Sequence, residues 1–405
     1  MRQTIKQYSA LLLFFCVMVS TPNVVYAEES EMVGELDTII SEVSAEGETG
    51  PQTMVSLGDS YSSGEGIEPF YHQDSPDKKN DPDWLGHRSE KCWSGQLKLP
   101  KNEQTMSAYK EGDDVRWYFV ATSGAETCHF YDSFDKKVSG SDPIEAQLKV
   151  FEKLEPGTVD YVTLTIGGND VKFADIITDC LIAGVPFTDK NKLSNRFEMT
   201  WNAFYNGDEN GESIRSKIKN AYKDISEKAG PQAHILVAGY PQLLSKDKNA
   251  GKVMAFLLKD ENIDLVNSNV TKFNTELALI VAECQADMDI RFVSVEEAFA
   301  GHEAYAAKDP YINPIIFVPT EQDISKKPPS AYSIHPNDKG ASAYAKCVQA
   351  AIDEIEGTSP HGGTSGSWQD LDPNFASDDW WNQIIEFFQK WMKDIEEQAI
   401  DVISD

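Results

Sequence analysis

The chain has 405 residues, with 36 lysines and arginines against 66 aspartates and glutamates, so its formal net charge is −30. Hydrophobic residues make up 40% and aromatic residues 10% of the chain, which is enough apolar material for a core and excludes wholesale disorder. The negative charge argues against a nucleic-acid binder and against docking on anionic lipid by charge, because both partners select a basic surface.

The first 27 residues, 1–27, predict a secretory signal peptide. Arg2 and Lys6 supply its positive end, and the apolar run that follows is too short to span a bilayer. Val25 and Ala27 place small residues at the −3 and −1 positions of a cleavage site. The alternative is a buried hydrophobic segment, which the combination of charge, length and small residues disfavours. We therefore expect a secreted, extracellular protein, and no later stretch reaches the length of a membrane span.

Five cysteines follow the signal peptide, and an oxidising compartment permits them to form disulfides. The number is odd, so at least one thiol stays unpaired or pairs outside the chain. We expect Cys92 to pair with Cys128 and Cys284 with Cys347, which leaves Cys180, although the spacing does not fix the connectivity. Each bridge would add about 2–4 kcal/mol to the free energy of unfolding. The sequence has no CxxC pair, which argues against a zinc knuckle or a thioredoxin-like site.

Residues 28–51 are predicted to be an acidic leader, rich in small residues. From residue 53 onward, short apolar runs recur, and each ends in a glycine or a turn. The runs are rich in β-branched and aromatic residues and are mostly apolar on both faces, as strands buried in a parallel sheet are. The predicted strands cover residues 53–58, 117–122, 161–168, 234–239 and 290–295.

Helical patterns lie between and after these runs. The predicted helices cover residues 143–154, 193–228, 251–287 and 340–356. The repeated alternation of strand and helix predicts an α/β fold with right-handed crossovers. The region 67–114 interrupts the alternation; because it is long and polar, we expect a structured insertion on the active face of the sheet.

The composition changes again after residue 356. Residues 357–376 are rich in glycine and serine and predict a flexible linker. Residues 377–405 predict an amphipathic helix with a broad apolar face and an acidic face. One interpretation is a helix that packs back on the main domain. The other is a lid or a helix that docks a partner, since an unpartnered apolar face is an interaction site or a liability.

Four short motifs supply the residues of a candidate reaction site. Residues 58–60 (Gly-Asp-Ser) follow the first predicted strand, residues 123–125 (Ser-Gly-Ala) the second and residues 167–170 (Gly-Gly-Asn-Asp) the third. Residues 335–337 (His-Pro-Asn) precede the last predicted helix. Because the carboxyl ends of neighbouring parallel strands open onto one crevice, we expect the first three motifs to meet there and the fourth to reach them from a loop.

These residue types fit acyl transfer. Ser60 would be the nucleophile, and His335 the base that takes its proton, because a serine hydroxyl is weak until it is deprotonated. The tetrahedral intermediate needs donors aimed at its oxyanion. The backbone N–H groups of Ser60 and Gly124 and the side-chain amide of Asn169 would supply three of them. Gly124 suits that task because it has no Cβ to obstruct the substrate.

Taken together, the motifs resemble the blocks of the SGNH hydrolase family, also called GDSL esterases and lipases, whose Ser, Gly, Asn and His match Ser60, Gly124, Asn169 and His335. The resemblance covers residues 52–356 and looks most like the secreted bacterial branch. It implies a flavodoxin-like three-layer α/β/α sandwich with a five-stranded parallel sheet in the order 2-1-3-4-5. It also implies hydrolysis of carboxylic esters with no metal and no cofactor. The substrate stays open among small-molecule, lipid and acylated-glycan esters.

One position departs from the family pattern. The family usually has an aspartate three residues before the histidine, and Tyr332 stands there in this sequence. Since a triad carboxylate normally holds the histidine tautomer, we expect a Ser60–His335 dyad in which the backbone carbonyl of Tyr332 accepts the second ring N–H. The alternative is a carboxylate from elsewhere in the chain.

Several acidic residues near the motifs have simpler interpretations. Asp59 and Asp170 are expected to hold their turns by hydrogen bonds rather than to take part in the reaction. Glu65 and Glu126 are expected to lie in solvated loops. Four aspartates crowd residues 74–83, where calcium is conceivable through oxygen ligands, but the spacing matches no EF-hand pattern and favours a solvated loop.

Two alternatives to a secreted serine esterase or lipase belong to other functional classes. The first is a non-catalytic surface protein that binds a glycan or another ligand on the same scaffold. The second is a protein that recruits a partner through the helix over 377–405. The intact set of serine, histidine and oxyanion donors argues against both, because binding alone does not require them together.

Overall fold

A computed structural model describes most of the chain between residues 51 and 357. The gaps within this range are residues 101, 111–112, 185–190, 208–210, 250–251 and 253–254. The predicted signal peptide (1–27), leader (28–51, apart from Pro51), linker (357–376, apart from Gly357) and C-terminal helix (377–405) lie outside the described residues.

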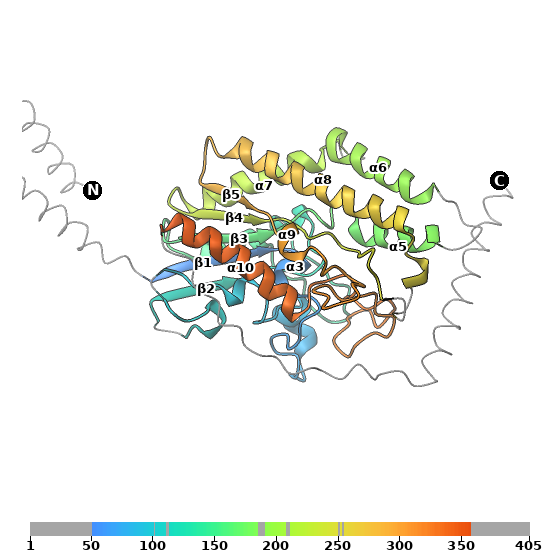
Figure 1. Ribbon diagram of the computed structural model, residues 1–405. Coiled ribbons are helices and arrows are strands. Elements are labelled where there is room, and N and C mark those ends of the chain that lie inside the picture. The colour runs from blue at the N-terminus through green and yellow to red at the C-terminus, as the bar shows by residue number, and fades with distance from the viewer. Residues whose placement is uncertain are drawn as a thin grey trace, which may run out of the picture. The chain divides into compact units, whose positions relative to one another are not determined.

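One parallel sheet of five strands forms the centre of the described part, in the order β2-β1-β3-β4-β5 (Figure 1). This order confirms the one that the family resemblance implied. The strands are β1 (Gln52–Gly58), β2 (Val115–Phe119), β3 (Tyr161–Thr165), β4 (His234–Ala238) and β5 (Ile290–Val293).

The central strands are buried on both faces, which explains why their sequences read as continuous apolar runs. Every residue of β1 and β3 is buried. Leu57 of β1 stands opposite Leu164 of β3 in the register, and both side chains are excluded from solvent. The few polar residues pair with one another: Ser56 Oγ lies 2.9 Å from Thr163 Oγ1 across the same two strands. Such pairing satisfies groups that would otherwise be buried without a partner.

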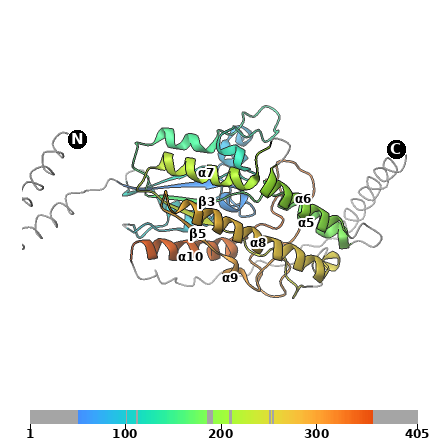
Figure 2. The ribbon, with the colours of Figure 1, turned by 90° about the horizontal axis from the view of Figure 1, so that it is seen from above.

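Helices cover both faces of the sheet, as in a three-layer sandwich. Figure 2 shows α7 (Ile214–Ala229) and α10 (Asp338–Ile355) on opposite sides of the strands. The long helix α8 (Asp260–Cys284) packs against α7 and β5. On α10, Tyr344, Val348 and other side chains at helical spacing are buried, and the Tyr344 hydroxyl donates to the Gly239 carbonyl at 2.8 Å, just after β4.

The remaining elements are short, or project beyond the carboxyl ends of the strands. Helices α5 (Phe173–Gly184) and α6 (Lys192–Asn206) follow β3 and lie to one side of the sheet (Figure 1). The short α-helices are α3 (Ser60–Ser63), α4 (Pro82–Leu85) and α9 (Glu296–Phe299). The 3₁₀ turns are η1 (Lys78–Asn80), η2 (Ser94–Gln96), η3 (Met106–Ala108), η4 (Thr127–Phe130), η5 (Gln147–Lys153) and η6 (Ala255–Leu257).

Three of the predicted helices differ from the observed elements. The predicted helix 193–228 is two helices, because the chain turns at Gly207 with φ at 101°, in a region that only glycine enters readily. The predicted helix 143–154 is the 3₁₀ helix η5. The predicted helix 251–287 begins only at Asp260, where α8 starts. Helix α5 was not predicted at all.

Part of the predicted insertion 67–114 packs in a second, smaller core, whereas Trp93, Leu97 and Met106 belong to the main core. Phe70, Trp84 and Leu85 form a second hydrophobic cluster with Ile144 and Tyr332. This cluster connects the insertion to the segment that carries the last sequence motif. None of the described helices is long and apolar enough to cross a membrane.

Both predicted disulfides are wrong in the described structure, where all five cysteines are free thiols. Cys92 is buried, with its sulfur 3.3 Å from Ser94 Oγ, whereas Cys128 is exposed. Cys284 ends α8, on the side of the sheet that α7 covers, whereas Cys347 belongs to α10 on the opposite side. The sheet therefore separates the members of the second pair. Cys180, predicted to be left over, is buried.

The turn after β1 depends on a glycine, which yields a first prediction. Gly58 has φ at +116°, and an added Cβ would lie 2.2 Å from the Thr165 carbonyl oxygen of β3. Gly140 has φ at +84°, but no atom lies within 4 Å of its Cβ position. We expect Gly140→Ala to lower the free energy of unfolding by about 1 kcal/mol, from backbone strain alone. Gly58→Ala should cost about 3 kcal/mol, because overpacking adds to that strain.

Urea denaturation of the two variants and the wild type measures this difference. Equal losses in both variants would contradict a steric requirement at residue 58.

Candidate active site

Ser60 follows the carboxyl end of β1, where a sharp turn places it in the lining of a cavity. β1 ends at Gly58, and α3 begins at Ser60. Asp59 caps α3, since its Oδ1 accepts from the Tyr61 N–H at 3.0 Å. The Gln147 side-chain amide clamps Gly58 from both sides: its oxygen accepts from the Gly58 N–H at 2.7 Å, and its nitrogen donates to the Gly58 carbonyl at 2.8 Å. The serine therefore stands on a fixed backbone.

His335 meets Ser60 across 275 residues of sequence. Nε2 of the ring lies 2.8 Å from Ser60 Oγ, within hydrogen-bond distance. Nδ1 lies 3.0 Å from the backbone carbonyl oxygen of Ser333. The prediction that the Tyr332 carbonyl accepts from the ring N–H is wrong. That carbonyl accepts from the backbone N–H of His335 instead, at 3.3 Å. The reason is local, because Ile334 has φ at 59° and the chain turns there.

The loop that carries His335 is braced on two sides. The Tyr61 hydroxyl, next to the serine, donates to the Ile334 carbonyl at 2.6 Å. Backbone hydrogen bonds join Asn313 to both Ile334 and His335, at 3.1 and 2.8 Å. Beyond the loop, Asn337 caps α10 through its side-chain oxygen. The position of the imidazole is thus tied to the residue that follows the serine.

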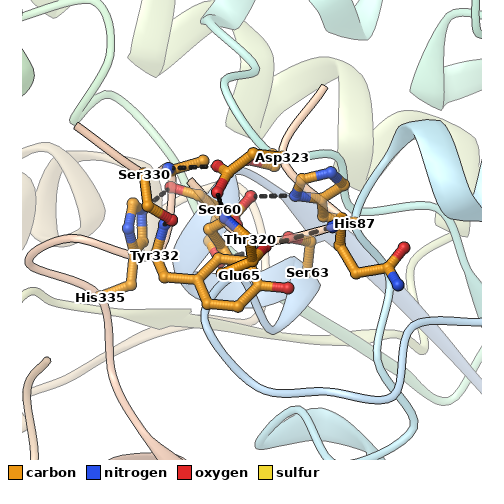
Figure 3. A network of polar contacts seen from close by, with 12 residues as sticks. Ser60, Ser63, Glu65, His87, Thr320, Asp323, Ser330, Tyr332 and His335 are labelled. Carbon is orange, nitrogen blue, oxygen red and sulfur yellow. Dashed lines mark hydrogen bonds and ion pairs between the residues drawn. The ribbon is translucent and has the colours of Figure 1, made fainter. Parts of the chain in front are cut away.

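A buried carboxylate holds the preceding segment. Oδ1 of Asp323 accepts from the Ala331 N–H and Oδ2 from the Thr320 N–H, each at 2.6 Å. Figure 3 shows Asp323, Thr320 and Ser330 in one network of polar contacts with Ser60 and His335. The sequence offered no signal for Asp323, because its partners are backbone groups that the local turn presents.

Gly124 and Asn169, the predicted oxyanion donors, line the same cavity as Ser60. Gly124 has φ at +80°, a conformation that a side chain would strain. The Asn169 side-chain nitrogen donates one hydrogen to the Ala125 carbonyl at 2.9 Å. An amide NH₂ has two hydrogens, so the second is free for another acceptor.

These residues open onto a cavity of about 450 Å³. That volume is within the range of about 300–1,000 Å³ that is typical of small-molecule sites. Its walls away from the serine are mainly apolar. They come from α5 and from the segments around η6 and residues 315–334, with Phe173, Ile177, Leu181, Leu257, Ile315 and Phe317 among them.

Comparison with known proteins identifies the family. The sequence profile of the GDSL-like lipase/acylhydrolase family matches residues 56–343. The chain belongs to this family. Two Streptomyces relatives are similar over 249 residues, or 62% of this chain: a protein named Lipase from Streptomyces rimosus (26% identity, 72% of its length) and one named Lipase 1 from Streptomyces coelicolor (28%, 71%). The chain is therefore a carboxylic ester hydrolase of the GDSL family.

A solved structure of this family shares the fold. The crystal structure of an extracellular lipase from Streptomyces rimosus superimposes with a TM-score of 0.51 at 20% sequence identity. The match covers 75% of this chain and 99% of that one.

His335 is suited to act as a base in this GDSL fold. Burial lowers its pKa below the usual value, and the negative charge of Glu65 opposes part of that decrease. A lowered pKa keeps the imidazole neutral at neutral pH, which a general base requires.

Glu65 was expected in a solvated loop, but the structure buries it. Its Oε2 lies 2.7 Å from Nδ1 of His87, and both side chains are almost excluded from solvent. Burial alone would raise the pKa of Glu65, but the His87 charge and hydrogen bond outweigh burial and hold it at about 2. In Figure 3, His335 and His87 lie on opposite sides of Ser60 and Glu65. The site thus contains a buried carboxylate that is paired with His87 and acts on His335 through its charge.

Asp59 and Asp170 have the structural roles that were expected of them. Asp59 is buried, accepts from the Thr165 hydroxyl at 2.7 Å and also accepts from the Tyr240 hydroxyl. Asp170 accepts from the N–H and the hydroxyl of Thr127. Both carboxylates therefore fix the turns that follow β1 and β3.

A possible cation-binding group lies in the insertion. Ligand atoms of His72, Asp81 and Asp83 lie within 4.8 Å of one another. Each of them already has a partner: His72 Nδ1 lies 2.7 Å from Asp81, and Arg88 donates to Asp83 at 2.6 Å. Asp81 also caps α4 through the N–H groups of Asp83 and Trp84. A cation would have to compete with these interactions.

The buried Asp59 carboxyl yields a second prediction. Burial raises its pKa to about 6 from the usual 3.8, so the folded protein binds this proton more tightly than the unfolded chain. The free energy of unfolding should therefore fall as the pH rises from about 4 to about 6, by about 3 kcal/mol from this group. Asn at residue 59 does not titrate. The stability of Asp59→Asn relative to the wild type should rise over that interval.

Urea denaturation at a series of pH values checks this. The difference between the two proteins isolates Asp59, since Glu65 titrates in both. A difference that is constant with pH would exclude the raised pKa.

Proposed function

We propose that this chain is an exported lipase that hydrolyses carboxylic esters of lipids through an acyl-enzyme on Ser60. The observation that carries the proposal is the contact of 2.8 Å between Ser60 Oγ and His335 Nε2 beside a mainly apolar cavity. A nucleophile with an adjacent base is the arrangement that acyl transfer needs.

The first half of the reaction transfers the acyl group. His335 Nε2 takes the hydroxyl proton of Ser60 as Oγ attacks the ester carbonyl carbon. The oxyanion that forms accepts hydrogen bonds from the Ser60 and Gly124 N–H groups and from the Asn169 amide. The C–O bond to the alcohol then breaks, and His335 gives its proton to the leaving alcohol.

The second half releases the acid. Water attacks the acyl-serine carbonyl and gives a proton to His335. The bond to Ser60 Oγ breaks, and the serine recovers its proton. The products are one carboxylic acid and one alcohol, which balances the addition of one water molecule.

The Ser333 carbonyl takes part of the role that a triad carboxylate has in other serine hydrolases. By accepting the Nδ1 proton at 3.0 Å, it leaves the lone pair of Nε2 directed at Ser60. A neutral carbonyl stabilises the imidazolium less than a carboxylate does. The charge of the buried Glu65 supplies further stabilisation at longer range.

The cavity supports an acyl chain as the larger part of the substrate. The lining residues Ile177 and Leu181 of α5, together with Phe317, present hydrocarbon rather than hydrogen-bonding groups. Burial of apolar surface stabilises binding by about 0.8 kcal/mol per methylene. The two relatives are named as lipases, which supports the same substrate class.

Export is supported by the signal-peptide pattern over residues 1–27 and by the extracellular Streptomyces rimosus lipase with the same fold. A non-catalytic binding protein or a partner-recruiting protein is not favoured, because the family match and the Ser60–His335 contact both indicate ester hydrolysis.

The third prediction tests the nucleophile. Hydrolysis of p-nitrophenyl esters from acetate to palmitate should fall at least about 10³-fold in Ser60→Ala, because the acyl-enzyme cannot form. Ser63→Ala is a matched control: Ser63 ends the same short helix, but its hydroxyl points to the Ser60 carbonyl. If Ser60→Ala kept the activity of the wild type, the proposed function would be wrong.

The fourth prediction tests the acyl cavity. Leu181→Trp would fill part of the apolar wall, so kcat/KM for palmitate should fall about tenfold or more while acetate is little changed. Leu279→Trp makes the same substitution at an exposed position of α8, where it should alter neither substrate. An equal effect of Leu181→Trp on both esters would show that the acyl chain binds elsewhere.

A further inference from the structure

In the turn that carries Gly124, the central peptide group, between Ser123 and Gly124, can adopt either of two opposite orientations. The Ala125 N–H donates to the Thr122 carbonyl at 3.0 Å, and Gly124, the third residue, has φ at +80°. This is the pattern of a type II turn. The peptide between Ser123 and Gly124 is planar and trans, so its C=O and its N–H point in opposite directions. Whatever holds the carbonyl therefore also directs the N–H.

Lys136 holds that carbonyl. Its Nζ donates to the Ser123 oxygen at 2.6 Å. The ammonium also lies 4.7 Å from the centre of the Phe134 ring. The same ring packs against Gly124, since an added Cβ there would lie 3.6 Å from it. Lys136 thus contacts the turn without lining the cavity.

We propose that Lys136 is a positioning residue for the oxyanion hole, which fixes and polarises the Gly124 N–H through the Ser123 carbonyl. The proposal rests on the acyl-transfer function given above. A hydrogen bond from an ammonium is about twice as strong as one between neutral groups. It withdraws electron density from the carbonyl, and an N–H in the same peptide becomes a better donor.

The neighbouring contacts fix the start of the turn but leave its central peptide to Lys136. The Ser123 N–H donates to the Gly86 carbonyl at 2.9 Å. Arg88 donates to the Ala121 carbonyl at 2.8 Å. Without a charge at residue 136, the peptide could rotate toward the type I form, in which the Gly124 N–H points away from the oxyanion.

The charges around Lys136 also make the contact sensitive to pH. The pKa of Lys136 is lowered to about 8: burial is the main cause, the charge of Glu65 opposes the decrease, and the charge of Arg88 adds to it. His129 also faces this cluster, stacked on Phe134 with ring centres 3.8 Å apart. The ammonium is present below that pH and is lost as the pH rises through it.

The fifth prediction compares two adjacent lysines. Lys136→Met should lower kcat about 10- to 100-fold and change KM less than twofold, since the Gly124 donor acts on the oxyanion and not on the bound ester. Lys137→Met is the matched control, because the Lys137 side chain is 83% exposed and pairs with Asp135. Thermal unfolding of both variants shows whether they fold.

A second measurement uses proteins that keep a cation at residue 136. The kcat of the wild type should decline above about pH 8, after subtraction of the hydrolysis seen with Ser60→Ala. In Lys136→Arg the decline should disappear, because a guanidinium stays protonated. This arm does not depend on whether Lys136→Met folds.

The outcomes separate the two proposals. Wild-type kcat in folded Lys136→Met, a change in KM alone, or the same alkaline decline in Lys136→Arg would each overturn the role of Lys136, while loss of activity in Ser60→Ala would still support the acyl-enzyme. Full activity in Ser60→Ala would overturn the acyl-enzyme itself.

Discussion

The hydrogen bond between Ser60 and His335 is the constraint on which the site depends. It joins the first strand of the sheet to a loop 275 residues later, so both ends need independent support. Asp59 and Gln147 hold the serine turn, and Tyr61 reaches across to the loop of the histidine. The sheet positions the serine turn, and these few buried polar contacts hold Ser60 Oγ within hydrogen-bond distance of His335 Nε2.

Two different groups orient the His335 ring and act on its charge. A carbonyl, that of Ser333, orients the ring, while the charge of Glu65 acts on it through the protein interior. Coulombic interactions between charges that are not in contact are stronger where water is excluded, because the effective dielectric constant is lower there. The surroundings set the pKa of each buried carboxyl. Burial raises the pKa of Asp59 to about 6, whereas the partner His87 holds the pKa of Glu65 at about 2.

The sequence predicted the features that depend on local pattern. All five strands were found from apolar runs, and the strand order and the family followed from the four motifs. Two failures depended on how distant segments pack: the burial of Glu65 requires His87 to face it, and the sheet separates Cys284 of α8 from Cys347 of α10. A third was local, because the Ser333 carbonyl reaches the ring through the turn at Ile334, which no residue pattern marks. Helix α5 (Phe173–Gly184) was not predicted.

Helix α5 lies outside the sheet, yet it supplies the wall of the cavity. The residues that hold the turn of Ser60 belong instead to β1, β3, the turns after them and η5, which carries Gln147. In the proposed function, the acyl chain is therefore selected in one part of the chain and the ester bond is cleaved in another. Substitutions in α5 can accumulate without moving the nucleophile, so this protein could acquire a preference for a different acyl chain while its reaction stays the same.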